Sequence, residues 1–419
     1  MSNFDDKNID YKNSVLHVEG VELNKIAAEA GTPTYVYSNE IFAENIINID
    51  QALRGAAHLV CYSVKVASNV GLLKKAAGLG AGADIVSGGE LYRCRKAGID
   101  PKKIVYSGVG KAAHEMAEAL DAGILMFNVE SAQELSLLAQ VASDKGKVAQ
   151  IAVRVNPDVD PQTHPYVATG LKESKFGVPA AEAMELYRIA KNTPSLKAIG
   201  LDCHIGSQLV SVAPFVAACE RLKRLFLDLR SQGINLTYID LGGGLGIRYN
   251  QEKPPTAKEY GEAVLNVLGD IDDLFLIVEP GRSVAGSAAV LLIKVLYNKR
   301  TDFKHFVVTD GAMNDLIRPC LYGSYHQIKT VNEKNQAPLT VDVVGPVCES
   351  GDFLAKDRPL APVEPGEYLA VLNAGAYGMT MSSNYNSRTR PAEVLVEGDS
   401  FKLIKQRETY DNLILGEIF

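Results

Sequence analysis

Residues 196–244 read LKAIGLDCHIGSQLVSVAPFVAACERLKRLFLDLRSQGINLTYIDLGGG, and this stretch decides the fold class. Two short apolar runs, 196–207 and 236–244, flank a longer segment, 212–233, whose apolar residues recur with the spacing of a helix. That segment ends in Gly233, and glycine suits the position just past a helix C-terminus. The pattern predicts a strand, a helix and a second strand, which is the βα repeat of a parallel sheet.

Further apolar runs of this kind occur on both sides of that stretch, with helix-like segments between them. The predicted strands begin at His58, Gly82, Lys103, Ile124, Val148, Leu196, Leu236 and Leu274. Eight βα repeats in roughly 230 residues favour a closed (β/α)8 barrel of the TIM type. An open, doubly wound sheet is the alternative for an α/β chain of this kind.

Beyond residue 283 the sequence changes to strand-like runs separated by turns, and strong helical segments largely disappear. The runs are residues 288–298, 304–311, 338–349, 367–378 and 392–398. They predict a mostly antiparallel β domain, to which an N-terminal strand around residues 14–20 is added. We therefore expect a barrel domain at 32–283 and a β domain built from 1–31 and 284–419.

Composition excludes several classes of function. The chain of 419 residues is 47% hydrophobic, and its net charge of −7 argues against binding to nucleic acid. No apolar run is long enough to span a membrane, and the first residues lack a basic region followed by an apolar one. The six cysteines form no C-x-x-C pair, so we expect a soluble, cytoplasmic protein without a metal site.

Polar residues lie at the ends of many predicted strands, where core packing does not require them. They are Lys65, Asp84, Ser87, Ser107, Asn128, Asn156, His204, Asp240 and Glu279. In a (β/α)8 barrel the C-terminal strand ends and the loops after them form the active site. We therefore expect these side chains to meet at one mouth of the barrel.

Two segments after the seventh and eighth strands are suited to binding phosphate. LGGGLG (241–246) is a glycine-rich turn whose backbone amides can approach a phosphate, and EPGRS (279–283) adds further donors and Arg282. Neither Walker A nor G-x-G-x-x-G is present. A simple tight turn is the alternative for the glycines, but phosphate sites in barrels recur in these two loops.

Glu279 and His204 each allow two interpretations. A carboxylate at the end of a buried strand is costly unless paired. Its partner is either the protonated ring nitrogen of a cofactor, or Arg282 or another cation of the barrel. His204 is either a core histidine with satisfied nitrogens or a flat ring that stacks on an aromatic cofactor.

Lys65 follows an apolar run in CYSVKVASN (61–69). Apolar surroundings lower the pKa of a lysine, which makes its amine a nucleophile toward an aldehyde. Together with a phosphate-binding loop and an acidic partner for a ring nitrogen, this predicts pyridoxal phosphate (PLP) held by Lys65. The alternative is a lysine that reaches to the end of the barrel or pairs with Asp84.

The sequence resembles the barrel-type, fold-type III PLP-dependent decarboxylases over nearly its whole length, and within them the branch that acts on diaminopimelate. The matching segments are YSVK, GADIVSGGEL, HPYVATGLKESKFGV, DCHIGSQ, DLGGGLG, EPGRS, DGAMNDLIRP, LYGSYH, GPVCESGD and GAYG. The resemblance implies a barrel plus a β domain from both chain ends, and a homodimer whose active sites are shared between subunits.

The resemblance also implies roles for individual residues. Lys65 would be the Schiff-base lysine, His204 would stack on the cofactor ring, and Glu279 would pair with its nitrogen. The implied phosphate ligands are Ser207, Gly243, Gly244, Glu279, Pro280, Gly281, Arg282 and Tyr377. The implied substrate contacts are Arg282, Arg318, Tyr322, Glu349 and Tyr377, and Cys348 of the second subunit would be the proton donor.

The residue types agree with that chemistry. Arg318 offers a fork of donors for a distal carboxylate and Glu349 can meet an ammonium group. A thiol can protonate the carbanion left by carbon dioxide. The alternatives are a surface or structural role for Arg318 and a small buried side chain for Cys348. Relatives usually have asparagine two residues after the lysine, whereas this chain has Ala67 there and Asn69 further on.

These implications predict a carboxy-lyase that converts meso-2,6-diaminopimelate to L-lysine and carbon dioxide, the last step of lysine biosynthesis by that route. A decarboxylase of ornithine, lysine or arginine on the same scaffold is the alternative. A PLP carrier without activity and an amino-acid racemase are less favoured, because the CES and NDLIRP segments suit neither.

Overall fold

The structure, a computed structural model, describes residues 8–159 and 175–418. The chain divides into two compact units. The barrel unit comprises Asn45–Arg248 and Glu252–Ser283, and the β unit comprises Met1–Glu44, Tyr249–Gln251 and Val284–Phe419. Most of the segment HPYVATGLKESKFGV lies outside the described residues.

The described part of the barrel unit contains eight parallel strands in a closed ring, in the order β10-β11-β12-β5-β6-β7-β8-β9. Their bounds are β5 Ala57–Ser63, β6 Gly82–Ile85, β7 Ile104–Tyr106, β8 Met126–Val129, β9 Ala149–Arg154, β10 Leu196–Asp202, β11 Tyr238–Asp240 and β12 Phe275–Val278. Pairing of β12 with β5 closes the ring, so the predicted barrel is confirmed and the open sheet is excluded.

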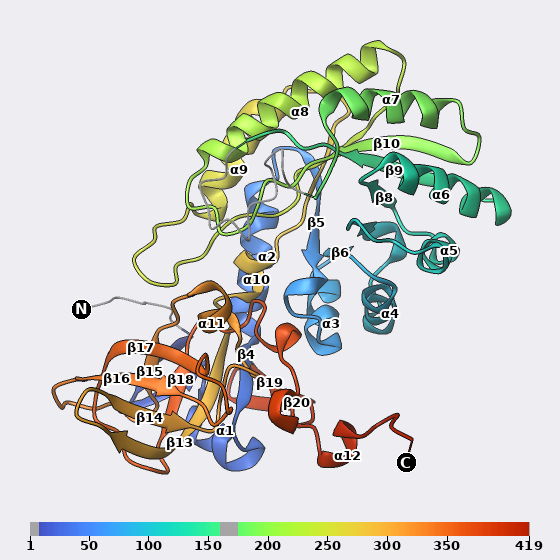
Figure 1. Cartoon of the computed structure of the whole chain (residues 1–419). Coiled ribbons are helices and arrows are strands. Elements are labelled where there is room, and N and C mark those ends of the chain that lie inside the picture. The colour runs from blue at the N-terminus through green and yellow to red at the C-terminus, as the bar shows by residue number, and fades with distance from the viewer. Residues whose placement is uncertain (1–7, 160–174, 419) are drawn as a thin grey trace. The chain divides into compact units, whose positions relative to one another are not determined.

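Helices follow the strands and surround the barrel (Figure 1). The α-helices are α2 Asn39–Ala52, α3 Val70–Gly78, α4 Gly88–Ala97, α5 Ala113–Ala122, α6 Ala132–Asp144, α7 Ala180–Lys191, α8 Ala213–Ser231, α9 Ala257–Leu268 and α10 Arg282–Ala285, with 3-10 turns η1 Val64–Val66 and η2 Pro101–Lys103. Helix α8 buries residues three and four apart, such as Phe215, Cys219 and Leu222. Gly233, at φ +75°, follows it as predicted.

Side chains from β5, β7, β8, β9, β10 and β12 pack together in one buried cluster of the barrel. Cys61, Val105, Met126, Ala152, Ile199 and Ile277 form this cluster. Gly200 of β10 leaves room for it, because a β-carbon there would lie 3.3 Å from both the sulfur of Met126 and the β-carbon of Ala152. The barrel is therefore a packed core, and its chemistry is confined to its ends.

The β unit contains a nine-stranded mixed sheet among the described residues, with β17-β16-β14-β13-β4-β19-β20 as its main path. Strand β18 pairs with β13, and β15 pairs with β18. The bounds are β4 Thr34–Ser38, β13 Ala289–Arg300, β14 His305–Thr309, β15 Ile328–Thr330, β16 Leu339–Val344, β17 Phe353–Leu360, β18 Tyr368–Val371, β19 Ala392–Glu397 and β20 Ser400–Lys405. Most of its pairs are antiparallel, but β14 pairs with β16 and β4 with β19 in parallel.

The N-terminal contribution to that sheet is β4 and not the predicted strand at 14–20. Residues Val15–Val18 form β2, which pairs with β1 Ile9–Lys12 and β3 Val21–Glu22 in a separate three-stranded sheet. Strand β4 is buried throughout because it lies between β13 and β19, although the predicted boundary had placed it with the barrel. Its sequence, TYVYS, does not alternate, as is typical of a strand buried on both faces.

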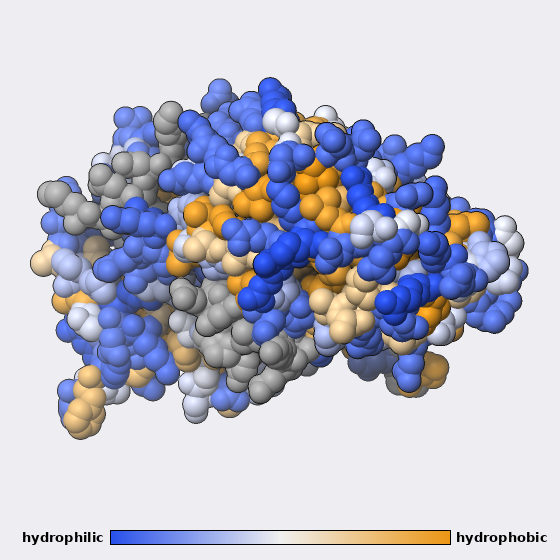
Figure 2. Space-filling view, turned by 90° about the horizontal axis from the view of Figure 1, so that it is seen from above, coloured by the Kyte–Doolittle hydropathy of each residue, from blue (hydrophilic) through white to orange (hydrophobic). Residues whose placement is uncertain are grey.

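Short helices complete the β unit: α1 Leu23–Ala30, α11 Arg318–Tyr322, η4 Met379–Met381, η5 Tyr385–Ser387 and α12 Tyr410–Leu413. Within the described ranges, no helix of either unit has the length and apolar character needed to cross a membrane. Figure 2 shows one face of the molecule, on which an apolar region is bordered by hydrophilic side chains.

Candidate active site

The loops after β5, β10, β11 and β12 are joined by backbone hydrogen bonds. The amide of Glu279 donates to the carbonyl of Gly242 at 2.8 Å, and the amide of Ser63 donates to that of Pro280 at 3.1 Å. The amide of Leu209 donates to the carbonyl of Gly244 at 2.9 Å. These C-terminal strand ends therefore form one connected mouth of the barrel.

Glycine is required in two of these loops because other chain segments approach closely. A β-carbon on Gly243 would collide with the carbonyl oxygen of Glu279, and one on Gly281 would collide with the side chain of Val66. Gly244 has φ +128°, which disfavours any other residue. The turn 241–246 is thus a tight turn in the structure, and this does not conflict with phosphate binding through its amides.

Lys65 lies in η1, directly after β5, and its ammonium group forms an ion pair with Asp84 at the end of β6. The lysine side chain is 34% exposed, whereas that of Asp84 is fully buried. The expectation of apolar surroundings is therefore wrong for the amine itself, although Val64 and Val66 on either side are buried. The ion pair holds the amine at the end of β5, beside the carboxylate of the neighbouring strand.

The residues after Lys65 have structural roles that explain the unusual end of the motif. Val66 packs against Gly281, and the carbonyl of Ala67 accepts a hydrogen bond from the hydroxyl of Tyr62 at 3.1 Å. Asn69 is the N-cap of α3, and its side chain accepts from the amide of Gly71 at 2.8 Å.

Glu279 directly follows β12, and its side chain is buried at the mouth of the barrel. It is 5% exposed, and the hydroxyl of Ser107 donates to its Oε1 at 3.2 Å. Burial, and then the nearby carboxylates of Asp240 and Asp84, raise the pKa of Glu279 well above its usual range. This carboxyl group therefore binds a proton readily and can share it with a basic nitrogen.

Two further buried carboxyl groups, Asp202 and Asp240, each bring an oxygen within 4.8 Å of one from Glu279. Asp240 accepts from the amide of Gly242 at 3.0 Å and from Asn128 at 3.2 Å. Burial raises its pKa to about 6, and burial also raises the pKa of Asp202. Carboxylates this close disfavour full ionisation of the three groups, so protonated forms are favoured beside Glu279.

Asp202 and Arg154 were not singled out from the sequence. Arg154 is 6% exposed, its NH1 donates to Glu130 at 3.0 Å, and its Nε lies 4.0 Å from Asp202. Asp202 lies two residues before His204, and residues two apart in a strand share a face. The predicted position of His204 could therefore have indicated Asp202. Arg154 lies inside a predicted strand, and nothing in its local pattern distinguishes it.

His204 follows β10 and is partly buried. The amide of Gly243 donates to its Nδ1 at 3.1 Å, and desolvation, with the charges of Arg154 and Lys65, lowers the pKa of the imidazole. The ring is therefore neutral at physiological pH and carries its proton on Nε2. This hydrogen bond fixes the plane of the ring relative to the glycine turn.

Ser207 and Arg282 contact each other across the same mouth, since Nε of Arg282 donates to the hydroxyl of Ser207 at 3.1 Å. Arg282 is 6% exposed, and Ser207 is partly buried. The barrel unit thus brings together Lys65, His204, Ser207, Gly243, Gly244, Glu279, Pro280, Gly281 and Arg282.

The remaining predicted site residues belong to the β unit. Arg318 begins α11 and is 4% exposed, so a surface role for it is excluded. Tyr322 ends the same helix and is partly buried, as is Tyr377, which has φ +58°. The positive φ of Tyr377 is costly for a non-glycine residue and marks a constrained backbone.

Cys348 and Glu349 lie in the segment between β16 and β17, and both are exposed. The interpretation of Cys348 as a small buried side chain is therefore wrong. Its amide donates to the side chain of Asn386 at 2.7 Å, and the hydroxyl of Tyr385 lies 3.5 Å from Glu349. These contacts hold the backbone while the thiol remains accessible in this subunit.

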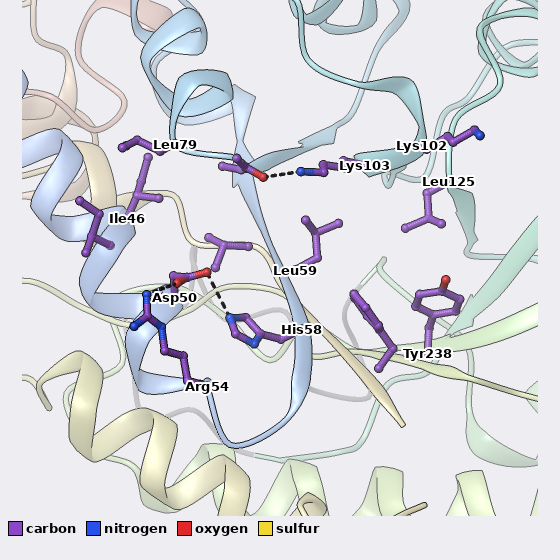
Figure 3. A pocket seen from close by; sticks show the side chains of 15 residues that line it. Ile46, Asp50, Arg54, His58, Leu59, Leu79, Lys102, Lys103, Leu125 and Tyr238 are labelled. Atoms are coloured by element: carbon purple, nitrogen blue, oxygen red, sulfur yellow. Dashed lines mark hydrogen bonds and ion pairs between the residues drawn. The ribbon is translucent and has the colours of Figure 1, made fainter. Parts of the chain in front are cut away.

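A pocket of about 410 Å³ lies at the opposite end of the barrel (Figure 3). Figure 3 shows Leu59, Leu125 and Tyr238 from the N-terminal parts of strands or just before them, beside a paired Asp50 and His58 at 3.3 Å. None of the predicted site residues lines this pocket. Residues at the N-terminal face of such barrels typically serve stability.

Comparison with known proteins identifies the family of the chain. Residues 40–286 match the family model described as pyridoxal-dependent decarboxylase, pyridoxal binding domain, which is more than half of the chain. The chain belongs to the pyridoxal-dependent decarboxylases. The match spans every barrel strand and every predicted site residue of the barrel unit.

Full-length relatives extend this result to the β unit. The diaminopimelate decarboxylase of Pseudomonas aeruginosa is 51% identical, covering 97% of this chain and 98% of the relative. That of Aquifex aeolicus is 49% identical, covering 97% and 96%. The structure of diaminopimelate decarboxylase from Helicobacter pylori with L-lysine is 40% identical, covers 94% and 98%, and has a TM-score of 0.90.

The residues of this pyridoxal-binding domain fit PLP in structural terms. The mouth combines a lysine amine in contact with a carboxylate, a buried carboxyl with a raised pKa and a neutral histidine ring. It also has a glycine turn that would not tolerate a β-carbon at Gly243. These are the groups that an aldehyde, a basic ring nitrogen, an aromatic face and a phosphate require.

Proposed function

We propose that this protein is a PLP-dependent carboxy-lyase that converts meso-2,6-diaminopimelate to L-lysine and carbon dioxide in lysine biosynthesis. The observation that carries the proposal is the full-length similarity, at about half identity, to enzymes named diaminopimelate decarboxylase. The chemistry of the barrel mouth agrees with it, because each group that PLP requires is present there.

PLP, when bound, supplies an electron sink for the carbanion that remains after carbon dioxide leaves. Lys65 is the residue that would bond to it, and Asp84 holds the end of the lysine side chain at the mouth through the ion pair. Ser63 supports this pair, since its hydroxyl donates to Asp84 at 2.9 Å.

Glu279 would hold a proton at the cofactor's ring nitrogen. The hydrogen bond from Ser107 orients the Glu279 carboxyl group, and burial with the nearby carboxylate of Asp240 raises its proton affinity. His204, fixed by the amide of Gly243, would lie against the ring face. Ser207, Gly243, Gly244 and residues 279–282 would bind the phosphate, and the resemblance adds Tyr377 to these ligands.

Arg318 and Glu349 would bind the distal carboxylate and ammonium groups, with Arg282, Tyr322 and Tyr377 as further substrate contacts. A guanidinium group offers two parallel donors to a carboxylate, and a lysine cannot imitate that geometry. Ornithine, lysine and arginine have no distal carboxylate. The distal carboxylate therefore distinguishes meso-diaminopimelate from these alternative substrates.

Arg318→Ala should selectively reduce turnover of substrates with a distal carboxylate. We expect kcat/KM for meso-diaminopimelate to fall by roughly a hundredfold or more, because a charge-assisted bidentate pair is lost. Release of carbon dioxide from meso-diaminopimelate, ornithine, lysine and arginine by the wild type and the variant, with PLP added, measures this. Faster turnover of ornithine than of diaminopimelate by the wild type would contradict the proposed substrate.

We also propose that the protein is a homodimer in which Cys348 of one subunit protonates the product carbanion in the site of the other. An exposed thiol beside Glu349 on a held backbone segment supports this, because the group is accessible to a second subunit. Such a shared site requires a symmetric pair of chains.

Mixing two inactive variants tests the shared site. Lys65→Ala and Cys348→Ala subunits, refolded or exchanged together, should regain about a quarter of wild-type activity, because half of the dimers contain one intact site of two. Each variant alone is the control. No regain of activity from a mixture in which differently tagged Lys65→Ala and Cys348→Ala subunits co-purify as mixed dimers would place Cys348 and Lys65 in the site of the same chain.

A further inference from the structure

Arg318 has a fully buried neighbour, His326, in the β unit. NH1 of Arg318 lies 2.9 Å from Nε2 of His326, and Nδ1 of the same ring lies 2.9 Å from the carbonyl oxygen of Leu372. His326 is 0% exposed and Arg318 is 4% exposed. Water therefore competes little for the hydrogen bond between Arg318 and His326.

The two partners of His326 determine which ring nitrogen carries the proton. A carbonyl oxygen only accepts, so Nδ1 bears the hydrogen and donates to Leu372. A guanidinium group only donates, so Nε2 offers its lone pair to Arg318. His326 is thus a neutral, oriented acceptor for one edge of the arginine.

Other contacts hold the same guanidinium group in its plane. Its carbon lies 4.7 Å from the ring centroid of Tyr249, and NH2 donates to the hydroxyl of Ser324 at 3.3 Å. The ring of Tyr249 in turn meets that of His326 at 5.3 Å, with 77° between the planes. The arginine is therefore held both along one edge and over one face.

The backbone of His326 is also held. NH1 of Arg358 donates to its carbonyl oxygen at 2.9 Å. The histidine is fixed through its backbone and through Nδ1, so Nε2 cannot follow Arg318 if the arginine rotates. The acceptor therefore prescribes one orientation for the guanidinium group.

We propose that His326 is a positioning residue that aligns Arg318 with the distal carboxylate of the substrate. This rests on the proposed function, in which Arg318 binds that carboxylate. A fork of donors binds two carboxylate oxygens only in the correct plane, and holding that plane in advance lowers the cost of binding. The contact is remote from the bond that breaks, so it affects binding of substrate and product more than the chemical step.

Two substitutions separate this role from a purely structural one. The amide of an asparagine at 326 can take the place of Nδ1 and donate to Leu372, but it does not reach Arg318. The longer glutamine can place its oxygen where Nε2 lies and accept from Arg318. His326→Gln thus keeps the proposed contact, and His326→Asn keeps the structural one.

We expect His326→Asn to raise KM for meso-diaminopimelate by about tenfold, with kcat changed less than about threefold, because one hydrogen bond to a charged group is lost. The dissociation constant of L-lysine, measured by calorimetry on the PLP-loaded protein, should rise by a similar factor, since L-lysine retains that carboxylate. His326→Gln should remain within about threefold of the wild type in both measurements.

Several outcomes would overturn the assignment. If His326→Asn binds like the wild type, or if His326→Gln is impaired as much as His326→Asn, His326 does not position Arg318. If His326→Asn fails to fold, Ser324→Ala replaces it, and unchanged L-lysine binding in that variant counts against an aligned guanidinium group. A wild type that releases no carbon dioxide from meso-diaminopimelate overturns the proposed function itself, and an active wild type with a normal His326→Asn variant overturns only this inference.

Discussion

Lys65→Ala should yield a folded protein whose decarboxylase activity is reduced by more than about a thousandfold, because a covalent catalyst has no substitute elsewhere in the site. The wild type with PLP should absorb in the visible region through the lysine-bound cofactor, and the variant should lack that band. Absorption spectra and carbon dioxide release on the same preparations measure both effects.

The ion pair with Asp84 makes a second substitution informative. Lys65→Arg keeps a positive charge next to Asp84 but has no amine that can react with an aldehyde. We expect its thermal stability to approach that of the wild type while the visible band and the activity are lost. Retained activity would show that Lys65 serves only to pair with Asp84. Lys102→Ala, an exposed lysine at the opposite end of the barrel, is the control and should retain the activity.

Glu279→Gln should lower kcat by roughly a hundredfold to a thousandfold, because a neutral amide cannot hold a proton at the ring nitrogen. The amide is the same size as the carboxyl group and can still accept from Ser107, so the loss should not come from misfolding. Steady-state rates at saturating PLP measure the effect. Activity within a few-fold of the wild type would show that Glu279 is not the partner of the ring nitrogen.

The same substitution should stabilise the protein when PLP has been removed. Burial raises the pKa of Glu279 above the value near about 4.3 that it has in an unfolded chain. Above that value the folded state binds more protons than the unfolded state, so the free energy of unfolding falls as pH rises toward the folded pKa. Glutamine never ionises, and we expect it to add about 1–3 kcal/mol at pH 8, with the gain shrinking toward pH 4.

Urea unfolding of the PLP-free protein at pH 5 and pH 8 measures this difference. Glu262→Gln on α9 removes a carboxylate from an exposed position and is the matched control, expected to change stability little at either pH. A Glu279→Gln variant that is less stable than the wild type at pH 8 would mean that its carboxylate is stabilised in the fold and not strained by burial.

Much of the barrel could be predicted because its signals are local. Each βα repeat has its own apolar period, and the eight predicted strands all occur in the ring. Strand ends such as Lys65, Asp84 and Glu279 could be placed at one mouth because parallel strands share their direction. The glycine-rich turn 241–246, together with Lys65 and Glu279 at strand ends, then predicts a PLP site from the sequence alone.

The rest depends on contacts that no local pattern records. The partner of Arg318 is eight residues away in sequence but reaches it through a buried hydrogen bond, and Arg154 meets Asp202 from a different strand. The ammonium of Lys65 was expected among apolar groups, yet the neighbouring strand supplies Asp84. The pairings between barrel strands depend on the register of one strand against another, and the contact of Arg318 depends on the path of the chain after α11.

Strand β4 has a consequence for how the chain is made. Val36 pairs with Val290 on one side and with Val394 on the other, so this central strand has no neighbour until β13 has been synthesised, and gains its second only with β19. The barrel strands lie between β4 and β13 in the sequence. The barrel can close before the large sheet forms, because its contacts are more local. While the barrel is being synthesised, TYVYS therefore has unpaired backbone groups on both edges, which makes it the segment of this sheet most exposed to wrong pairing.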